Sequence, residues 1–339
     1  MLIFERASIK GAGDLVSRKD VAVLAGVSPA SVSFYVNKSG YVSAAAKERI
    51  QKAIDELGYT PNLVARSLKI KDNKQFLFFC NEIRNPFFSE LVYRATVAAK
   101  KLGYSIIFSC VVDDEDYIRK LCGYQVAGVF APNTKISNAI IEEIVKKDIP
   151  VVLLCDRDTD DINAKVTKIK VDYSHISHDI VAHLKDGNYS NTVYFSGSLS
   201  EEEVDDKTAS FISAYNIGAL DIKYNITSSD KAYRYVKEFY TKESHPDSFC
   251  CTNDAVAMGV LKGLHELGLR VPDVAVIGFD NTVESNIVIP GITTVDIDMK
   301  EMGNIAIDLL MKKVRGQEAE NHYAEPKLII RESSQRKVI

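Results

Sequence analysis

From residue 73 to the C-terminus, short apolar runs alternate with amphipathic segments, and this alternation restricts the fold more than any other feature of the chain. Segments with helical periodicity, such as NAIIEEIVKKD and DAVAMGVLKGLHELG, separate the apolar runs. Strands that alternate with helices form parallel sheets covered on both faces, and eight strands suit two such sheets. The sequence therefore predicts an α/β body with two doubly wound parallel sheets. The predicted strands are FLFFCNEI, YSIIFSC, VAGVFAP, PVVLLCD, KIKVD, NTVYFSG, SFCCTN and VAVIGFD.

Polar residues follow several of these predicted strands. Asp156 and Arg157 come after VVLLC, Asn253 comes after SFCCT, and Asp280 comes after VIGF. In doubly wound sheets the ligand binds at the carboxyl ends of the strands, so these positions predict a small-molecule site. The alternative is that the aspartates only end their strands, because Asp is common in turns.

The first seventy residues have a different pattern, that of three short helices. The segment DVAVLAGVSPASVSFYVN breaks at Gly26, which supplies the conformation that ends a helix. Ser28 can cap a second helix with Pro29 in its first position, where a missing N–H costs nothing. A third helix over residues 44–57 stops at Gly58. This plan is typical of a helix-turn-helix domain, and a small helical bundle that packs against the body is the alternative.

The apolar positions of these three segments predict the core of the small domain. The first helix, over residues 18–25, has Val21 and Leu24 on one face, and the second directs Val32 and Val36 inward. The third helix is capped by Ser43 and buries Ile50, Ala53, Ile54 and Leu57.

The segment TPNLVARSLKIKDN follows the third helix and carries an apolar stripe flanked by basic residues. About eight residues are too few for a helix that is stable alone, so this helix would form only against a partner. Leu68 would then serve as an apolar wedge in a DNA minor groove, with Arg66 and Lys69 on phosphates.

Charge is distributed unevenly along the chain. Residues 17–72 contain nine Lys and Arg against five Asp and Glu, a net charge of +4, and residues 1–16 are balanced. Because the whole chain has a net charge of −4, residues 73–339 carry a net charge of −8. A basic N-terminal part on an acidic body favours a polyanionic partner for the N-terminal part alone.

Composition narrows the class of protein. With 339 residues, 46% of them hydrophobic, the chain is long enough for two or three soluble domains. No apolar run approaches the ~20 residues that span a bilayer, and the N-terminal stretch is a poor signal peptide, so the sequence predicts a cytoplasmic protein without membrane contact. The six cysteines lie mostly in apolar runs without C-x-x-C spacing, which predicts buried thiols in a reducing compartment. Adjacent Cys250 and Cys251 would face opposite sides of a strand.

An enzymatic function is the first rival interpretation. His175, His178 and His183 lie on one predicted helix, but no Cys or acidic cluster completes a metal site, and solvent-facing histidines are the simpler interpretation. The sequence shows no phosphate-cradling glycine loop, nucleophile elbow or paired catalytic carboxylates. We therefore expect ligand binding without catalysis, and no cofactor or metal.

Two long segments, RKDVAVLAGVSPASVSFYVN and GYVSAAAKERIQKAIDELGYTPNLVARSLK, resemble the headpiece and hinge of the lac-repressor (LacI/GalR-type) family of bacterial transcription regulators. In the body, NPFFSELVYRATVAAKKLGY, LGLRVPDVAVIGFDN and LIIRESS resemble the effector domain of the family, which is built like a periplasmic sugar-binding protein. The resemblance covers residues 17 to about 335. It implies a helix-turn-helix DNA-binding domain over residues 17–60, a hinge helix and linker over 61–72, and an effector-binding and dimerisation domain of two subdomains over 73–339. Residues 1–16 lie outside the family pattern and are expected to be disordered, unless the native chain starts at Val16 through an alternative initiation codon.

The resemblance also implies how DNA is bound. A homodimer would place its second helices in the major groove of two operator half-sites, and its paired hinge helices would insert Leu68 at the centre. Pro29 and Ala30 cannot donate hydrogen bonds from their side chains, and Phe34 offers only apolar contact unless it is a core residue, so we expect modest direct readout. The implied DNA-binding residues are Ser28, Pro29, Ala30, Ser31, Ser33, Phe34, Asn37, Asn62, Ala65, Arg66, Leu68 and Lys69.

The resemblance also implies which residues form the effector pocket, at the positions where motifs of this chain match those of the family. The resemblance implies that the rings of Phe87 and Phe88 sandwich a ligand while carboxylate, amide and guanidinium groups bind its hydroxyls. This set is most similar to ribose-type binding proteins, which favours a monosaccharide. The chain departs from the family pattern at Lys207, where Arg is common, and at Ile297, where Gln is common. The implied pocket residues are Asn85, Phe87, Phe88, Asp156, Arg157, Lys207, Asn253 and Asp280.

The predicted function is allosteric repression, in which a small molecule changes the affinity for operator DNA. Three alternatives stay open at this point. The effector could be a nucleoside or purine, the coregulator could be a protein, or the chain could be a solute-binding protein without a DNA role. The basic headpiece argues against the last of these.

Overall fold

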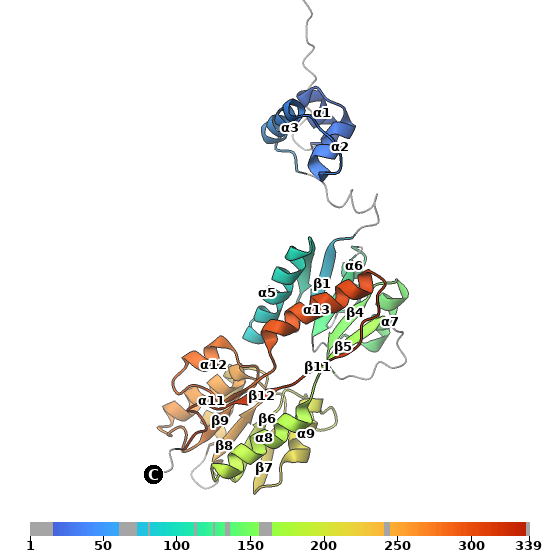
Figure 1. The fold of residues 1–339 in the computed structure, drawn as a ribbon. Helices are drawn as coiled ribbons and strands as arrows, with labels where there is room; N and C mark the ends of the chain where they lie inside the picture. The colour runs from blue at the N-terminus through green and yellow to red at the C-terminus, as the bar shows by residue number, and fades with distance from the viewer. Residues whose placement is uncertain are drawn as a thin grey trace, which may run out of the picture. The chain divides into compact units, whose positions relative to one another are not determined.

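The computed structural model describes residues 16–60, 73–80, 82–111, 114–124, 126–132, 136–155, 165–240 and 245–336. The chain divides into two compact units, residues 1–72 and residues 73–339 (Figure 1). Each unit is described by itself. The predicted hinge helix over residues 61–72 and the predicted disorder of residues 1–16 concern segments outside the described residues, apart from Val16.

Within residues 16–60, the described part of the smaller unit, lie three helices, α1 (Arg18–Ala25), α2 (Pro29–Asn37) and α3 (Ala44–Leu57), as the sequence predicted. The side chains of Ser17, Ser28 and Ser43 each accept a hydrogen bond from the backbone of the first turn that they cap. Gly26 and Gly58 both have φ of 61° and end α1 and α3 in the left-handed conformation. The helix boundaries are therefore encoded locally, by caps and glycines.

The core of this unit corrects one predicted position. Val21, Val32 and Ile50 are fully buried, but Leu24 is 46% exposed. The small side chains of Ala22 and Ala25 are buried instead, where α1 packs against both α2 and α3. Two alanines let the helix backbones approach closely, and this rotation of α1 leaves Leu24 at the rim of the core.

The larger unit has two parallel sheets, which form the two subdomains that the sequence predicted. The first is six-stranded, with the order β11-β5-β4-β3-β1-β2, and the second is four-stranded, with the order β7-β6-β8-β9. A two-stranded antiparallel ribbon joins β10 to β12. The strand bounds are β1 (Gln75–Phe79), β2 (Ser105–Ser109), β3 (Gly128–Pro132), β4 (Val151–Leu154), β5 (Val166–Val171), β6 (Asn191–Phe195), β7 (Ala219–Lys223), β8 (Ser248–Cys251), β9 (Ala275–Ile277), β10 (Thr294–Asp296), β11 (His322–Ala324) and β12 (Lys327–Ile329).

All eight predicted strands are confirmed, and the described ranges of the body contain four further strands that were not predicted. β7 was missed because it is an exposed edge with little apolar character. β10, β11 and β12 have three residues each, too few to produce a pattern. β11 extends the first sheet although it comes from the far end of the chain, where it pairs with β5.

Helices cover both faces of each sheet (Figure 1). In the first subdomain, α5 and α13 pack on one face, and α7 packs on the other with α6 beside it. In the second, α8 and α9 lie on one face and α10 and α11 on the other. The bounds are α5 (Pro86–Lys101), α6 (Glu115–Cys122), α7 (Asn138–Lys146), α8 (Tyr173–Asp186), α9 (Asp206–Ala214), α10 (Ser229–Phe239), α11 (Asp254–Glu266), α12 (Val283–Ile287) and α13 (Met299–Val314).

The alternation of side chains across β8 confirms the expected behaviour of its two cysteines. Cys250 packs in the cluster under α8 and α9, and Cys251 packs in the cluster under α10 and α11. All six cysteines are present as thiols, four of them buried and Cys110 and Cys155 partly exposed. Burial raises the pKa of Cys122 to about 11, so its thiol stays protonated at neutral pH.

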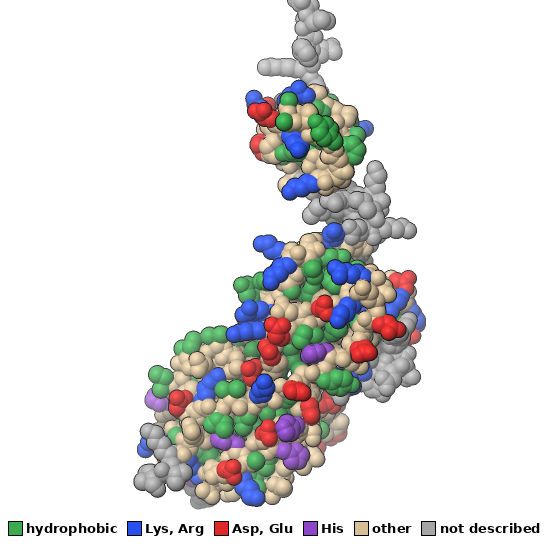
Figure 2. Space-filling model, in the orientation of Figure 1, with side chains coloured by type: hydrophobic (Ala, Val, Ile, Leu, Met, Phe, Trp, Pro, Cys, Tyr) green, Lys and Arg blue, Asp and Glu red, His purple; other side chains and the backbone are tan. Residues whose placement is uncertain are grey.

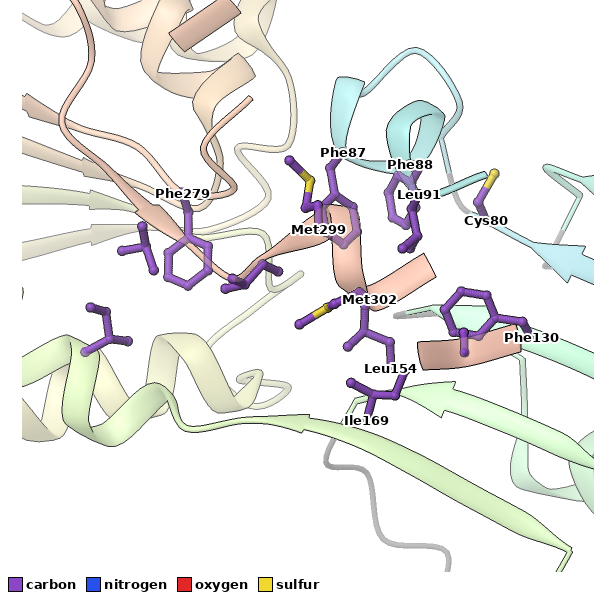
Figure 3. Packing of buried hydrophobic residues seen from close by; sticks show 14 of the residues in the cluster. Cys80, Phe87, Phe88, Leu91, Phe130, Leu154, Ile169, Phe279, Met299 and Met302 are labelled. Atoms are coloured by element: carbon purple, nitrogen blue, oxygen red, sulfur yellow. The ribbon is translucent and has the colours of Figure 1, made fainter. Parts of the chain in front are cut away.

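The chain passes three times between the subdomains, from β5 to α8, from β10 to α13, and from β11 to β12. Near these crossings one buried cluster runs from the first subdomain into the second and includes Phe88, Met302 and Phe279 (Figure 3). Gly303 lets α13 approach α5, because a Cβ at this position would lie 2.9 Å from the backbone nitrogen of Ala95. The two subdomains therefore share one continuous apolar core near the connections between them.

Among the described residues, no helix combines the length and the apolar character that a bilayer crossing requires.

Candidate functional site

The N-terminus of α2 presents short side chains to solvent. Ser28, Pro29 and Ala30 are exposed, and the Oγ of Ser28 accepts a hydrogen bond of 3.1 Å from the backbone N–H of Ser31. The two hydroxyls of Ser28 and Ser31 also lie 3.0 Å apart. This end of the helix can therefore approach another surface closely, but its hydroxyls are already engaged with each other.

Phe34 lies on the outside of α2 and is not a core residue. It is 44% exposed, whereas Val32 on the inner face is fully buried. Its ring packs over the loop after α2, because a Cβ added to Gly40 would lie 2.8 Å from two ring carbons. The ring is thus held in a fixed place with an apolar surface still available for contact.

The C-terminal half of α2 is held by side-chain hydrogen bonds. Asn37 donates through Nδ2 to the Oγ of Ser33 at 3.1 Å, which uses part of the hydrogen-bonding capacity of both predicted DNA-binding residues. The hydroxyl of Tyr35 donates to Oε1 of Gln51 at 2.7 Å and fixes α2 to α3. Tyr35 and Gln51 were missed in the sequence, since a tyrosine next to Phe34 gives no sign of which ring faces inward.

The remaining predicted DNA-binding residues belong to the hinge segment. Asn62, Ala65, Arg66, Leu68 and Lys69 lie outside the described residues.

The loop before α5 carries the first predicted effector residues. Asn85 is half-buried and caps α5, and its Oδ1 accepts a hydrogen bond of 3.0 Å from the backbone N–H of Phe87. The rings of Phe87 and Phe88 are almost completely buried and meet edge to face, with centroids 4.9 Å apart (Figure 3). In this conformation the two rings contact each other directly, and a ligand between them, as the resemblance implies, stays a prediction. Their direct contact gains aromatic and packing energy that a ligand would have to replace.

In the second subdomain, Asp280 lies at a strained turn three residues beyond the end of β9. Asp280 has φ of 105° and Asn281 has φ of 51°, conformations that non-glycine residues seldom adopt. The backbone N–H of Asp280 donates to the carbonyl oxygen of Val295 at 2.9 Å, and the residue is almost completely buried. Strain of this kind persists only where the surrounding structure enforces it, which is common at ligand sites.

The side chains of Asp254 and Arg331 hold this turn in place through hydrogen bonds. Asp254 is fully buried and accepts hydrogen bonds from the backbone N–H of Thr282 at 2.8 Å and from the hydroxyl of Thr294 at 2.6 Å. Arg331 donates to Oδ1 of Asn281 at 2.6 Å and to the carbonyl oxygen of Ile292 at 2.7 Å. Burial raises the pKa of Asp254 to about 6, although its hydrogen bonds oppose the shift.

Lys207 extends from α9 into the same region. Its Nζ donates to the carbonyl oxygen of Thr252 at 2.9 Å and lies 3.7 Å from the ring centroid of Phe279, a cation–π contact. Burial lowers the pKa of Lys207, and the negative charge of Asp280 opposes that shift. Burial likewise raises the pKa of Asp280, with Lys207 acting in the opposite direction. The charges of Lys207 and Asp280 thus act on each other, and their common role in an effector site stays a prediction.

Two aromatic residues of this region, Tyr173 and Phe279, were not predicted. The ring of Tyr173, the first residue of α8, lies 5.9 Å from that of Phe279 and 5.8 Å from Nζ of Lys207. The predicted effector residue Asn253 is half-buried and caps α11, with Oδ1 accepting from the backbone N–H of Val256 at 2.9 Å. The position of Phe279 next to Asp280 was the one available signal, but a strand-end phenylalanine is more often a core residue.

Two predicted effector residues, Asp156 and Arg157, lie outside the described residues. Ile297, which stands where relatives often carry Gln, is buried in the cluster that joins the subdomains.

The three histidines of α8 do not gather into one site. His175 and His178 are exposed, and Nε2 of His183 makes a hydrogen bond of 2.7 Å with the hydroxyl of Ser334. His175 and His183 line an open groove of about 770 Å³ with several carboxylates, and Figure 2 shows histidine and acidic side chains together over α8. Within the described ranges, no group of three or more His, Cys, Asp or Glu side chains is arranged to hold a metal ion.

Two family models match the chain. Residues 18–62 match the model described as bacterial regulatory proteins, lacI family, and residues 181–334 match the periplasmic binding protein-like domain. The first match covers the three-helix unit and the second covers most of the second subdomain.

Curated relatives align over almost the whole chain. The HTH-type transcriptional regulator RegA of Clostridium saccharobutylicum is 31% identical, covering 94% of this chain and 99% of the relative. The catabolite control protein A of Priestia megaterium is 30% identical over 86% of this chain and 91% of its own length. The HTH-type transcriptional repressor PurR of Photobacterium profundum is 28% identical over 93% of this chain and 97% of its own length.

Solved structures share the fold. The lac repressor dimer bound to operator and the anti-inducer ONPF has a TM-score of 0.79 at 23% identity, covering 95% of this chain and all of that one. A LacI family regulator from Enterococcus faecium with bound ribose has a TM-score of 0.70 at 23% identity, covering 77% of this chain and 98% of that one. At these identities the likeness supports the architecture.

Proposed function

Because the chain belongs to the lacI family of bacterial regulatory proteins, we propose that it binds operator DNA as a homodimer and that its effector is a monosaccharide. As a member of this family it is a helix-turn-helix transcriptional repressor with an allosteric, ligand-binding second domain. The relatives are named as regulators, and the proposed action is binding without turnover.

The observation that carries the sugar proposal is the grouping of Lys207, Asp280 and Phe279. An ammonium group and a carboxylate in a poorly hydrated place can bind neighbouring hydroxyls, and an aromatic face can take the C–H side of a sugar ring. The strained backbone at Asp280 supports the same assignment, because hydrogen bonds to its own backbone N–H and to its neighbour Asn281 hold this turn in one conformation. A LacI family structure with bound ribose is a precedent on the same fold.

A nucleoside or purine effector is the second candidate. The rings of Tyr173 and Phe279 favour it, because a flat base can stack on either aromatic face. Asn253 could then read the edge of the base through its side-chain amide.

The DNA-binding surface is proposed to be the N-terminal end and outer face of α2. Pro29 and Ala30 allow close approach, and Phe34 can contact a thymine methyl group in the major groove. No arginine or glutamine occupies the exposed start of α2, so affinity would depend on phosphate contacts and on insertion of Leu68. A salt titration of operator binding measures the phosphate part of this affinity.

Three exposed apolar residues support the homodimer. Val283 and Ile287 on α12 are 66% and 68% exposed, and Ile289 just beyond it is 97% exposed. Large aliphatic side chains grouped at one place on a surface are costly in water and mark an interaction site. A second copy of the chain is the partner that the two-fold symmetry of operators requires.

A ligand screen tests the effector proposal. The full chain is titrated by calorimetry with a panel of monosaccharides, purine bases and nucleosides, and hits are tested for a change in operator affinity. We expect a monosaccharide to bind, and Asp280→Ala to abolish this binding while operator affinity persists. Glu142→Gln, on the exposed face of α7, is the control and should bind normally. Binding of a purine but no sugar would replace the monosaccharide by the second candidate.

A further inference from the structure

Two cysteines lie side by side at the carboxyl ends of neighbouring strands. Cys80 follows β1 and Cys110 follows β2, which pair in parallel with Phe79 opposite Ser109. The backbone N–H of Cys80 donates to the carbonyl oxygen of Ser109 at 3.0 Å, so the pairing continues to this point. The two Sγ atoms are 3.6 Å apart, and both thiols are free.

The two thiols have unequal access to solvent. Cys80 is fully buried and belongs to the cluster that contains Phe87, Phe88 and Leu91 (Figure 3). Cys110 is partly exposed and packs against the same cluster. Burial, followed by the interaction with Cys110, raises the pKa of Cys80 to about 12, so this thiol holds its proton at neutral pH. A soluble oxidant therefore reaches Cys110 first and finds a protonated thiol directly behind it.

The spacing of the strands permits a covalent link. Neighbouring strands lie about 4.8 Å apart, within the ~4.4–6.8 Å that separate the Cα atoms of disulfides. The sulfur atoms would have to approach by about 1.5 Å to reach the disulfide bond length, a movement that rotation about the side-chain bonds can supply. Because the thiols are already in contact, the second step of oxidation is intramolecular and strongly favoured over reaction with another molecule.

We propose that Cys80 and Cys110 form an oxidant-sensing dithiol whose co-reactant is a hydroperoxide such as hydrogen peroxide. The Cys110 thiolate attacks one peroxide oxygen, the O–O bond breaks, and hydroxide leaves and takes up the proton that the thiol released. The resulting sulfenic acid on Cys110 is attacked by the sulfur of Cys80. The S–O bond then breaks, and the hydroxyl group leaves as water with the proton of Cys80. Two thiols and one peroxide thus give one disulfide and two molecules of water.

The disulfide acts at the base of the segment that leads into α5. Cys80 comes five residues before Asn85, and its side chain packs in the cluster that contains Phe88. A bond to Cys110 fixes this base to β2 and restrains residues 82–88. This step rests on the proposed function and on the sequence prediction that Asn85, Phe87 and Phe88 line the effector site; oxidation then weakens effector binding by about tenfold.

The dithiol is tested on the full-length protein by treatment with hydrogen peroxide and mass spectrometry. We expect a loss of about 2 Da and a Cys80–Cys110 linked peptide that dithiothreitol removes, as for other reversible disulfides. Cys110→Ser should abolish the link. Cys155→Ser, which removes the other partly exposed cysteine, should retain it. Oxidation of Cys110 only to sulfinic acid, or links formed equally by Cys155, would overturn the proposal.

Hydrogen exchange tests the structural consequence without any effector. Amides of residues 82–91 should exchange more slowly in the oxidised protein, and those of α11 should not change. Unchanged exchange in residues 82–91 would overturn the regulatory role even if the disulfide forms. Titration of both redox forms with the sugar panel is a separate arm: a panel without any ligand counts against the proposed function, whereas the dithiol is judged by the linked peptide and by exchange.

Discussion

The Nζ atom of Lys207 lies 3.7 Å from the ring centroid of Phe279, and its hydrogen bond goes to the backbone carbonyl of Thr252. The ammonium group thus has a backbone acceptor and an aromatic face, and it stands within electrostatic range of Asp280. Such a group can turn toward a hydroxyl without first breaking a salt bridge.

Lys207→Ala should therefore weaken effector binding by roughly ten- to one-hundredfold, the loss of a hydrogen bond to a charged donor (~1.5–3 kcal/mol). Lys262, whose Nζ lies 4.6 Å from the ring centroid of Tyr233 on an exposed surface, offers the same chemistry away from the site. Calorimetry with the effector found in the panel should show wild-type affinity for Lys262→Ala. Equal losses in both variants would exclude a direct role for Lys207.

The buried carboxyl of Asp254 should make stability depend on pH. Its pKa is raised from 3.8 to about 6 in the folded protein. Between these two pH values the folded chain holds a proton that the unfolded chain has released, so stability falls as the pH rises through the window and then levels off. From pH 4.5 to pH 7 this group should lower the free energy of unfolding by about 2 kcal/mol.

Urea unfolding at the two pH values measures this change. Asp254→Asn should abolish this change in the free energy of unfolding between the two pH values, whatever the substitution does to stability at a single pH. Asp308→Asn on the exposed side of α13 should keep the wild-type difference. A wild-type pH dependence in Asp254→Asn would show that other groups cause it.

Phe34 should matter for DNA and little for the fold. Because its ring is 44% exposed, Phe34→Ala should reduce operator affinity while the three-helix unit keeps its thermal midpoint within a few degrees. Val32→Ala, on the opposite face of the same helix, should instead destabilise this unit by about 2–3 kcal/mol through lost burial and a cavity. Circular dichroism and fluorescence anisotropy separate the two effects. Strong unfolding by Phe34→Ala would contradict the assigned exposure.

Leu68→Ala tests the hinge prediction, which lies outside the described residues. If Leu68 is a minor-groove wedge, the variant should lose specific operator binding far more than nonspecific binding, because only specific DNA is bent around the wedge. Competition with nonspecific DNA gives the ratio of the two affinities. Equal losses would refute the wedge.

Ile289→Glu should break the homodimer. The side chain is 97% exposed, so the monomer should fold normally, and a buried unpaired carboxylate would oppose association at the proposed interface. Sedimentation velocity should show a monomer for this variant and a dimer for Glu320→Gln, a substitution in the loop before β11. A dimer in both proteins would place the interface elsewhere.

Local signals explain why the headpiece was predicted so closely. Serine caps and left-handed glycines encode the ends of α1, α2 and α3 within a few residues, and the structure places all three where the sequence did. Apolar runs encode β1 to β6, β8 and β9 in the same way. Leu24 was misplaced because its direction depends on how α1 rolls against two other helices, which periodicity does not report.

The candidate site was predicted only in part, for a related reason. Lys207 and Asp280 could be placed from their motifs, but the edge-to-face contact of Phe87 with Phe88 depends on rotamers that the buried cluster selects. Tyr173 lies at a helix start with no distinctive sequence pattern, and its ring meets Phe279 through the buried cluster that both residues contact. Side-chain direction in a cleft is a property of tertiary packing.

The pairing of β11 with β5, together with the packing of α13 on α5, sets an order for biosynthesis. The first subdomain, which begins at residue 73, lacks its edge strand β11 and the covering helix α13 until residues 299–324 have left the ribosome. The second subdomain, whose four-stranded sheet ends with β9, can complete that sheet earlier. The main sheet of the first subdomain is therefore completed after that of the second, although its translation begins first, and ribosome stalling before residue 299 would leave it with an open apolar face.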